Sequence, residues 1–125
     1  MMPYERFTAW KATHRLALEI YEVTERRPRN EKYGLTSQVR RAALSAPTNI
    51  AEGAARRGSR EIRRYLNIAL GSLSELSYLL RFTRDRSILN EQPWQDLEAR
   101  RIDASKLTWR LYERVRAHAN AHPPD

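Results

Sequence analysis

The feature that most constrains the fold of this chain is an unbroken heptad pattern between residues 60 and 84. Apolar or small side chains recur there at alternating steps of four and three residues: Ile62, Leu66, Ala69, Leu73, Leu76, Leu80 and Thr83. Five more apolar side chains flank this stripe: Tyr65, Ile68, Leu70, Leu79 and Phe82. A heptad repeat keeps one side of a helix against a partner helix along its whole length. The widened stripe is what a helix in a bundle or an oligomer needs.

Three other segments, residues 9–25, 34–57 and 91–117, also have helical periodicity. The second of them places small or apolar residues at steps of three and four: Leu35, Val39, Ala42, Ala46, Ile50 and Gly53. Pro47 lies inside this segment. A proline there removes one backbone hydrogen bond and crowds the preceding turn, at a cost of about 3 kcal/mol. We therefore expect the second helix to kink or break at Pro47.

Short connections between these segments determine how the helices are arranged. Gly58 suits a position just past the second helix and Ser59 suits the N-cap of the third, so these two helices should form an antiparallel hairpin. The sequence therefore predicts an all-α fold, an antiparallel up-down-up-down four-helix bundle that is a single domain over residues 1–125. We expect the bundle to be ordered over about residues 8–118, with a frayed tail at 119–125.

Several classes of protein are excluded by what the chain lacks. It has no cysteine, and therefore no disulfide framework, no thiolate zinc site and no cysteine nucleophile. No segment approaches the roughly 18 consecutive apolar residues that a membrane span needs, and the start of the chain has no apolar run of signal length. Glycine-rich phosphate loops and Glu-x-x-His metal pairs are absent from the sequence. We expect a cytoplasmic, non-enzymatic protein that uses no cofactor and no metal.

The excess of positive charge is concentrated in one part of the sequence. The chain has 23 Lys and Arg against 15 Asp and Glu, a net charge of +8, and 20 of the 23 are arginine. Residues 1–25 have a net charge of −1, residues 26–64 of +8 and residues 65–125 of +1. The planar guanidinium fork suits bidentate contact with phosphate, and a dense basic patch releases condensed counterions when it binds nucleic acid. The clustering therefore favours an interface for nucleic acid.

Seven arginines make up the candidate nucleic-acid site: Arg40, Arg41, Arg56, Arg57, Arg60, Arg63 and Arg64. The last five fall within nine residues, where the second and third helices should meet. No helix-turn-helix or single-strand-binding motif accompanies them, so we expect binding of RNA or DNA with low sequence specificity. Two other interpretations fit the same residues. They could form a solvated helix face, or an interface in which the arginines pair with acidic groups of another subunit.

The most distinctive phrases of the chain are EKYGLTSQVRRAALSAPTNIAEGAARR, at residues 31–57, and YLNIALGSLSELSYLL, at residues 65–80. Within a match over about residues 7–116, they resemble a family of small bacterial four-helix-bundle proteins. That family includes the proteins encoded in intervening sequences of 23S ribosomal RNA genes. It also includes the accessory proteins of diversity-generating retroelements. The residues fit both branches.

The resemblance implies an antiparallel four-helix bundle that assembles into homo-oligomers, typically pentamers, with a basic surface. For the retroelement branch it implies two further partners, nucleic acid and a reverse transcriptase, which such a protein serves as an accessory. The ribosomal-gene branch adds no settled biochemical role. We therefore expect self-association and nucleic-acid binding, with a reverse transcriptase as a candidate protein partner.

The phrase SAPTNIAEG contains Asn49, Glu52 and Gly53. Glu52 could act as a catalytic base only beside a nucleophile or a metal, and the sequence offers neither partner. We expect Glu52 to pair with a nearby arginine and Gly53 to allow close packing of helices. The side chains of Thr48 and Asn49 are expected to satisfy backbone groups freed by Pro47.

Seven aromatic side chains at helical spacing are expected in the core or at an interface: Trp10, Tyr21, Tyr65, Tyr78, Trp94, Trp109 and Tyr112. Tyr65 lies beside two of the candidate arginines and is the one that we would test for stacking on a base. The histidines, His14, His118 and His122, have no spacing typical of a metal site.

Three functions are consistent with the sequence. The favoured one is a non-catalytic, oligomeric protein that binds nucleic acid through its arginine cluster. The second is an assembly module that contacts only proteins. The third is a ribonuclease, because Arg116 and His122 loosely resemble the Arg–His signature of the helical HEPN-type ribonucleases. That pair lies at the expected frayed end of the chain, whereas a catalytic pair needs a rigid and buried setting.

Overall fold

The computed structural model describes residues 1–25 and 32–123, and four long helices account for most of them. α1 spans Thr8–Glu25, α2 spans Ser37–Ala54, α3 spans Ser59–Asp85 and α4 spans Glu91–Ala121. A short 3₁₀ helix, Pro3–Arg6, precedes α1, and a π-helical turn, Lys32–Thr36, leads into α2. No strand occurs in these described residues, and the prediction of an all-α four-helix bundle is confirmed.

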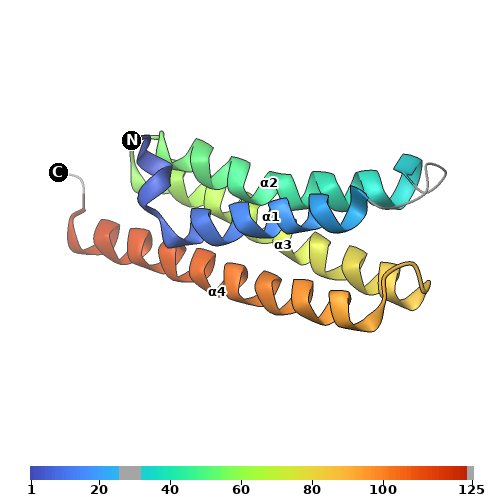
Figure 1. Cartoon of the computed structure of the whole chain (residues 1–125). Coiled ribbons are helices and arrows are strands. Elements are labelled where there is room, and N and C mark those ends of the chain that lie inside the picture. Colours follow the sequence, from blue (N-terminus) through green and yellow to red (C-terminus); the bar gives the residue numbers. More distant parts are fainter. Residues whose placement is uncertain (26–31, 124–125) are drawn as a thin grey trace.

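The four helices lie along one another, and the chain passes back and forth between the two ends of the bundle (Figure 1). α1 leads away from the end that carries the N-terminus, α2 returns, α3 leads away again and α4 returns. The turn between α2 and α3 and the C-terminal end of α4 therefore lie at the same end of the bundle. Among the described residues, no helix is both long enough and apolar enough to cross a membrane.

The core consists mainly of leucine and alanine. The central heptad positions of α3 are at most 1% exposed: Leu66, Ala69, Leu73, Leu76 and Leu80. They belong to two buried clusters that the other helices complete with Leu16, Ile20, Ala42, Ala46, Ile50, Leu97, Ala104 and Leu111. Burial of these side chains confirms that the heptad stripe faces the inside of the bundle. The buried hydroxyls of Thr13, Thr83 and Thr108 are satisfied within their own helices, as when Thr13 donates to the carbonyl oxygen of Ala9 at 2.9 Å.

Predicted helix boundaries are wrong in three places. α2 ends at Ala54, three residues before the expected end at Arg57. Gly58 is the N-cap of α3, and Ser59 is already its first helical residue. The φ angle of Gly58 is +84°, a conformation that glycine adopts without steric cost. α4 continues to Ala121, so it includes part of the segment that was expected to fray.

α2 continues through Pro47, so the helix does not break there. The neighbouring side-chain bonds run from Thr48 Oγ1 to the Leu44 carbonyl oxygen and from Asn49 Nδ2 to the Ser45 carbonyl oxygen, each 2.8 Å long. The carbonyl that loses its partner to proline is that of Ala43. These two side chains therefore bond the adjacent carbonyls, and the expectation that they satisfy the freed group is wrong.

α2 and α3 approach each other closely at Gly53. A Cβ atom added to this buried glycine would lie 2.9 Å from the Cβ atom of Tyr65 and 3.3 Å from the carbonyl oxygen of Ile62. Farther along the same pair of helices, the hydroxyls of Ser45 and Ser72 are hydrogen-bonded at 2.8 Å. The expectation that Gly53 allows close packing is confirmed, and this contact holds the chain just before it turns from α2 into α3.

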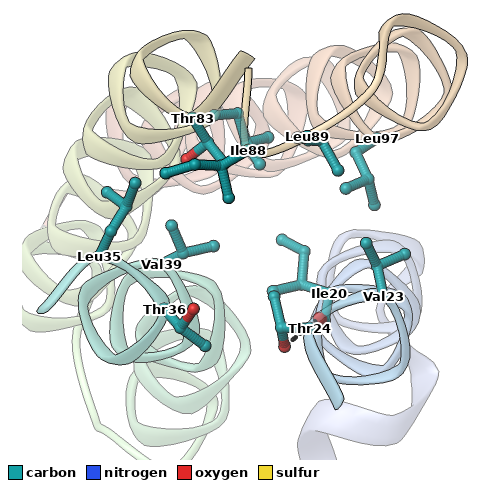
Figure 2. A pocket seen from close by; sticks show the side chains of 11 residues that line it. Ile20, Val23, Thr24, Leu35, Thr36, Val39, Thr83, Ile88, Leu89 and Leu97 are labelled. Carbon is teal, nitrogen blue, oxygen red and sulfur yellow. Dashed lines mark hydrogen bonds between the residues drawn. The ribbon is translucent and has the colours of Figure 1, made fainter. Parts of the chain in front are cut away.

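A small apolar cavity lies toward the opposite end of the bundle, with all four helices around it (Figure 2). Its lining includes Ile20, Val23 and Thr24 of α1, Val39 of α2, Leu80 and Thr83 of α3, and Leu97 of α4. Ile88 and Leu89, from the turn between α3 and α4, also contribute to it. The cavity has a volume of about 30 Å³. This space is on the scale of a methyl group, so the packing is incomplete at this point.

Replacing Val39 by isoleucine should stabilise the protein by about 1 kcal/mol, because the added methylene would fill the cavity and bury apolar surface. Val39 is 4% exposed, and its side chain points into the cavity (Figure 2). Urea denaturation of both proteins would measure the difference. A lower free energy of unfolding for Val39→Ile would show that the space cannot take the extra atom.

Candidate nucleic-acid interface

Five of the seven candidate arginines lie at one corner of the bundle, where α2 passes into α3. We use the name arginine corner for residues 52–64, which contain Glu52, Glu61 and these five: Arg56, Arg57, Arg60, Arg63 and Arg64. The corner is built by the short link of residues 55–58 between the two helices. The positive φ of Gly58 lets the chain reverse there, so the arginines that precede and follow it lie close together.

Arg40 and Arg41 lie away from this corner. Arg41 is separated from the end of α2 by 13 residues, which is about 20 Å along the helix axis at 1.5 Å per residue. The half-buried Arg40 donates through Nε to Thr24 Oγ1 at 2.7 Å and lies 4.5 Å from the centre of the Tyr21 ring. Arg40 therefore ties α2 to α1. Arg40 and Arg41 are therefore separated along α2 from the arginines at the turn between α2 and α3.

Arg63 is held by the first turn of α3. Its Nε atom donates to Ser59 Oγ at 3.0 Å and to the Ser59 carbonyl oxygen at 3.3 Å. Ser59 Oγ also lies 3.4 Å from the carbonyl oxygen of Val115, to which it donates. Ser59 thus links three elements of the site: the start of α3, the guanidinium of Arg63 and the last turns of α4.

Two glutamates neutralise part of the corner. Glu52 accepts from Arg56 Nη2 at 2.9 Å, which confirms the expected pairing of Glu52 with an arginine. Glu61 accepts from Arg64 through both carboxylate oxygens, at 3.0 and 3.3 Å. This hydrogen bond lowers the pKa of Glu61 below its ordinary value and raises the pKa of Arg64. Glu61 therefore keeps its negative charge to a lower pH than a glutamate without this partner.

The ring of Tyr65 is already in contact with cations of its own chain. The guanidinium carbon of Arg64 lies 4.5 Å from the ring centre and that of Arg56 lies 5.0 Å from it. The Cβ atom of Tyr65 meanwhile packs where α2 and α3 cross at Gly53. These contacts hold Tyr65 in a structural position between the two helices.

Arg57 and Arg60 are exposed cations of the corner that form no ion pair with any residue the structure describes. Within residues 1–25 and 32–123, no carboxylate lies within ion-pair distance of either guanidinium. The corner as a whole holds five arginines against two glutamates, a formal charge of +3. Two unpaired guanidinium groups in a field of net positive charge form a surface that attracts phosphate.

The sequence did not predict that the end of α4 belongs to this region. The bond from Ser59 to Val115 brings it there, because antiparallel packing places the last turns of α4 beside the first turns of α3. The predicted antiparallel order of the helices was the signal that could have placed the end of α4 there. Of the basic residues of α4, Arg100, Arg101 and Arg116 are paired with glutamates, whereas Lys106 and Arg110 have no such pair among the described residues.

None of the seven aromatic side chains named above is fully buried, but Trp10, Trp94 and Tyr112 pack against the core clusters from their edges. Small aliphatic residues fill the narrow space between the helices, and the larger rings lie at its edges. Trp10 stacks on His14 with ring centres 4.8 Å apart, and the guanidinium carbon of Arg84 lies 4.3 Å from the ring centre of Trp94. Tyr78 and Trp109 are the most exposed of the set, at 65% and 50%.

The pair that resembles a ribonuclease signature lies on the surface. Arg116 is ion-paired with Glu113 at 2.8 Å. His122 directly follows the last turn of α4, and its ring stacks on that of His118 with centres 4.3 Å apart. Neither Arg116 nor His122 is buried. In the part of the chain that the structure describes, no group of three or more His, Asp or Glu side chains could hold a metal ion.

Comparison with known proteins places the chain in a family. No curated protein sequence matches it. A family model described as 23S rRNA-intervening sequence protein matches residues 5–110, which include α1, α2, α3 and most of α4. The match covers the whole arginine corner and agrees with the helical bundle. This chain therefore belongs to the family of 23S rRNA-intervening sequence proteins.

Proposed function

We propose that this protein is not an enzyme and that it binds nucleic acid, RNA or DNA, through the arginine corner. The observation that carries the proposal is the pair of exposed guanidinium groups, Arg57 and Arg60, which have no carboxylate partner among the described residues. The description of the family, which refers to 23S ribosomal RNA, supports an association with RNA.

The arrangement supports binding to the phosphate backbone with little reading of bases. The corner is a turn between two helices, and it presents cations on both sides of Gly58. Phosphate contacts position a nucleic acid and release counterions, but they carry no sequence information. We therefore propose binding of low sequence specificity that weakens steeply as salt concentration rises.

A salt series of binding measurements tests this proposal. Fluorescence anisotropy of labelled RNA and DNA should show binding at low salt, with the logarithm of the binding constant falling linearly against the logarithm of salt concentration. Absence of binding to both nucleic acids at low salt would eliminate the proposal. Binding that is insensitive to salt would show that the guanidinium groups are not its source.

Removing the two carboxylates of the corner should strengthen binding. The double variant E52Q/E61Q raises the formal charge of the corner from +3 to +5, so phosphate is attracted more strongly and the slope of the salt series becomes steeper. Both ion pairs are exposed to solvent, so the variant should unfold at nearly the same urea concentration as the wild-type protein. Equal or weaker binding by the variant would contradict an interface at this corner.

We also propose that the protein self-associates, as a pentamer on the resemblance given above, and serves as an accessory to a reverse transcriptase or another enzyme of nucleic acids. Three apolar side chains on the outer face of α3 support self-association: Ile68, Tyr78 and Phe82 are 41%, 65% and 41% exposed. Light scattering would give the mass in solution, and a monomer at every concentration would contradict the proposal. An oligomer that binds no nucleic acid would instead support the assembly module, for which the same apolar face is the evidence.

A further inference from the structure

Two contacts between α3 and α4 determine how these antiparallel helices line up. Ser59 Oγ donates to the carbonyl oxygen of Val115, and Ser77 Oγ donates to Glu98 Oε1, each at 3.4 Å. The contacts are 18 residues apart on α3 and 17 residues apart on α4. Because each helical residue rises about 1.5 Å, the two helices advance by nearly the same length between these contacts. Residues of α3 can therefore be matched to the residues of α4 at the same level by counting from either contact.

This register places Trp109 beside the arginine corner. Counting four residues on from Ser59 reaches Arg63, which is level with Leu111, four residues before Val115 and next to Tyr112. Counting four more reaches the exposed Asn67, and Trp109 is level with the turn between Arg63 and Asn67. The indole therefore lies about one helical turn along the bundle from the arginines that begin α3.

Trp109 is arranged as a flat and accessible surface. It is 50% exposed, although it is among the largest apolar side chains of the protein. Its ring lies nearly parallel to that of Tyr112, at 8° with the ring centres 5.4 Å apart. This stacking holds the orientation of the indole and covers only one of its faces. A ring that is already oriented loses little conformational entropy when another aromatic group stacks on it.

The charges around Trp109 are mainly positive. Lys106 and Arg110 flank it on α4, and neither has an ion pair among the described residues. Arg63 of α3 lies at nearly the same level along the bundle, and Glu113 of α4 is ion-paired with Arg116 at 2.8 Å. A basic surface repels an identical surface of a second copy and attracts a polyanion. An exposed aromatic ring among cations is the arrangement that binds unpaired bases.

We propose that Trp109 stacks on an unpaired base of the bound nucleic acid while Arg60 and Arg63 hold its phosphates. The ligand class is therefore single-stranded nucleic acid, or a loop that displays a free base, because the faces of paired bases are hidden inside a duplex. This inference rests on the nucleic-acid binding proposed above, and it adds both the class of ligand and the residue that recognises it.

Tryptophan fluorescence tests the stacking directly. The chain has three tryptophans, and the double variant W10F/W94F retains only Trp109. We expect its emission to be quenched by an oligouridylate of about 12 nucleotides and not by heparin, a polyanion without bases. The matched variant W94F/W109F retains only Trp10 and should show no quenching at saturation. Emission from Trp109 that is unchanged when anisotropy shows the oligouridylate to be bound would overturn the inference and leave the proposed function standing.

Affinity gives an independent test. Trp109→Ala should weaken binding of the oligouridylate by about 5- to 100-fold and leave binding of a duplex of equal length unchanged. Trp109→Phe should bind the oligouridylate more tightly than Trp109→Ala and less tightly than the wild-type protein. Equal losses for single strand and duplex would overturn the inference. A change in oligomer mass on Trp109→Ala would assign this residue to a subunit contact and also overturn it. Failure of the wild-type protein to bind either ligand at low salt would remove the proposed function together with the inference.

Discussion

Reversing the charge of Arg57 and Arg60 is expected to abolish nucleic-acid binding at moderate salt. The double variant R57E/R60E changes the formal charge of the arginine corner from +3 to −1. Each lost phosphate contact lowers the slope of the salt series by about one, so the slope should fall by about two. The fold should be retained, because Arg57 is in the link between helices and a glutamate near the start of α3 interacts favourably with the helix dipole.

The matched control is R41E/R86E, which changes the net charge of the protein by the same amount at the other end of the bundle. Both side chains are exposed, and neither has an ion pair with a described carboxylate. Anisotropy with the same labelled RNA would compare the two variants, and circular dichroism would check that both remain helical. If the two variants lose equal affinity, binding depends on total charge and the corner is not the site.

Gly53→Ala should destabilise the protein by about 2 kcal/mol, or about 8 °C in melting temperature for a domain of this size. The new Cβ atom would lie 2.9 Å from the Cβ atom of Tyr65. Neither atom can rotate away, because a Cβ position follows from the backbone, so α2 and α3 must separate. The gain in helix propensity, about 1 kcal/mol, offsets only part of the cost of this overpacking.

Gly71 supplies the control for that substitution. It also lies inside a helix, but a Cβ atom there would meet nothing within 4 Å. Gly71→Ala should therefore stabilise the monomer by about 0.5–1 kcal/mol through helix propensity alone. Thermal melts of both variants separate the two effects. A Gly53→Ala protein as stable as the Gly71→Ala protein would mean that the helices are farther apart at Gly53 than the structure shows.

Much of the fold follows from the spacing of apolar residues, because the steps of four and three in α3 can bury a single stripe only in a helix. The helix boundaries were harder to predict from the sequence. Gly58 and Ser59 both have the chemistry of helix ends, but Gly58 is the N-cap, and the hydroxyl of Ser59 donates to the distant carbonyl oxygen of Val115. The extent of α4 also departs from local sequence signals, since the helix continues to Ala121.

The sequence predicted which arginines cluster, and the structure shows where each of them lies. Clustering in the sequence identified Arg57 and Arg60, because neighbours in the chain are neighbours at a turn. Clustering could not separate Arg57 and Arg60 from Arg40. Arg40 lies on α2, where it donates a hydrogen bond to Thr24 and its guanidinium lies over the ring of Tyr21. Nor could clustering place Trp109 at the level of the corner, because that placement depends on the register of α3 against α4. Contacts between distant segments are the part that a local pattern leaves out.

The most direct test of the central claim is chemical footprinting of arginine with phenylglyoxal, read residue by residue by mass spectrometry. We expect Arg57 and Arg60 to react readily in the free protein and to be protected when RNA is bound, while Arg86 reacts equally in both. Protection of Arg57 and Arg60 in the absence of RNA would mean that another subunit covers them. Equal reaction of these two residues with and without bound RNA would contradict an interface at the arginine corner.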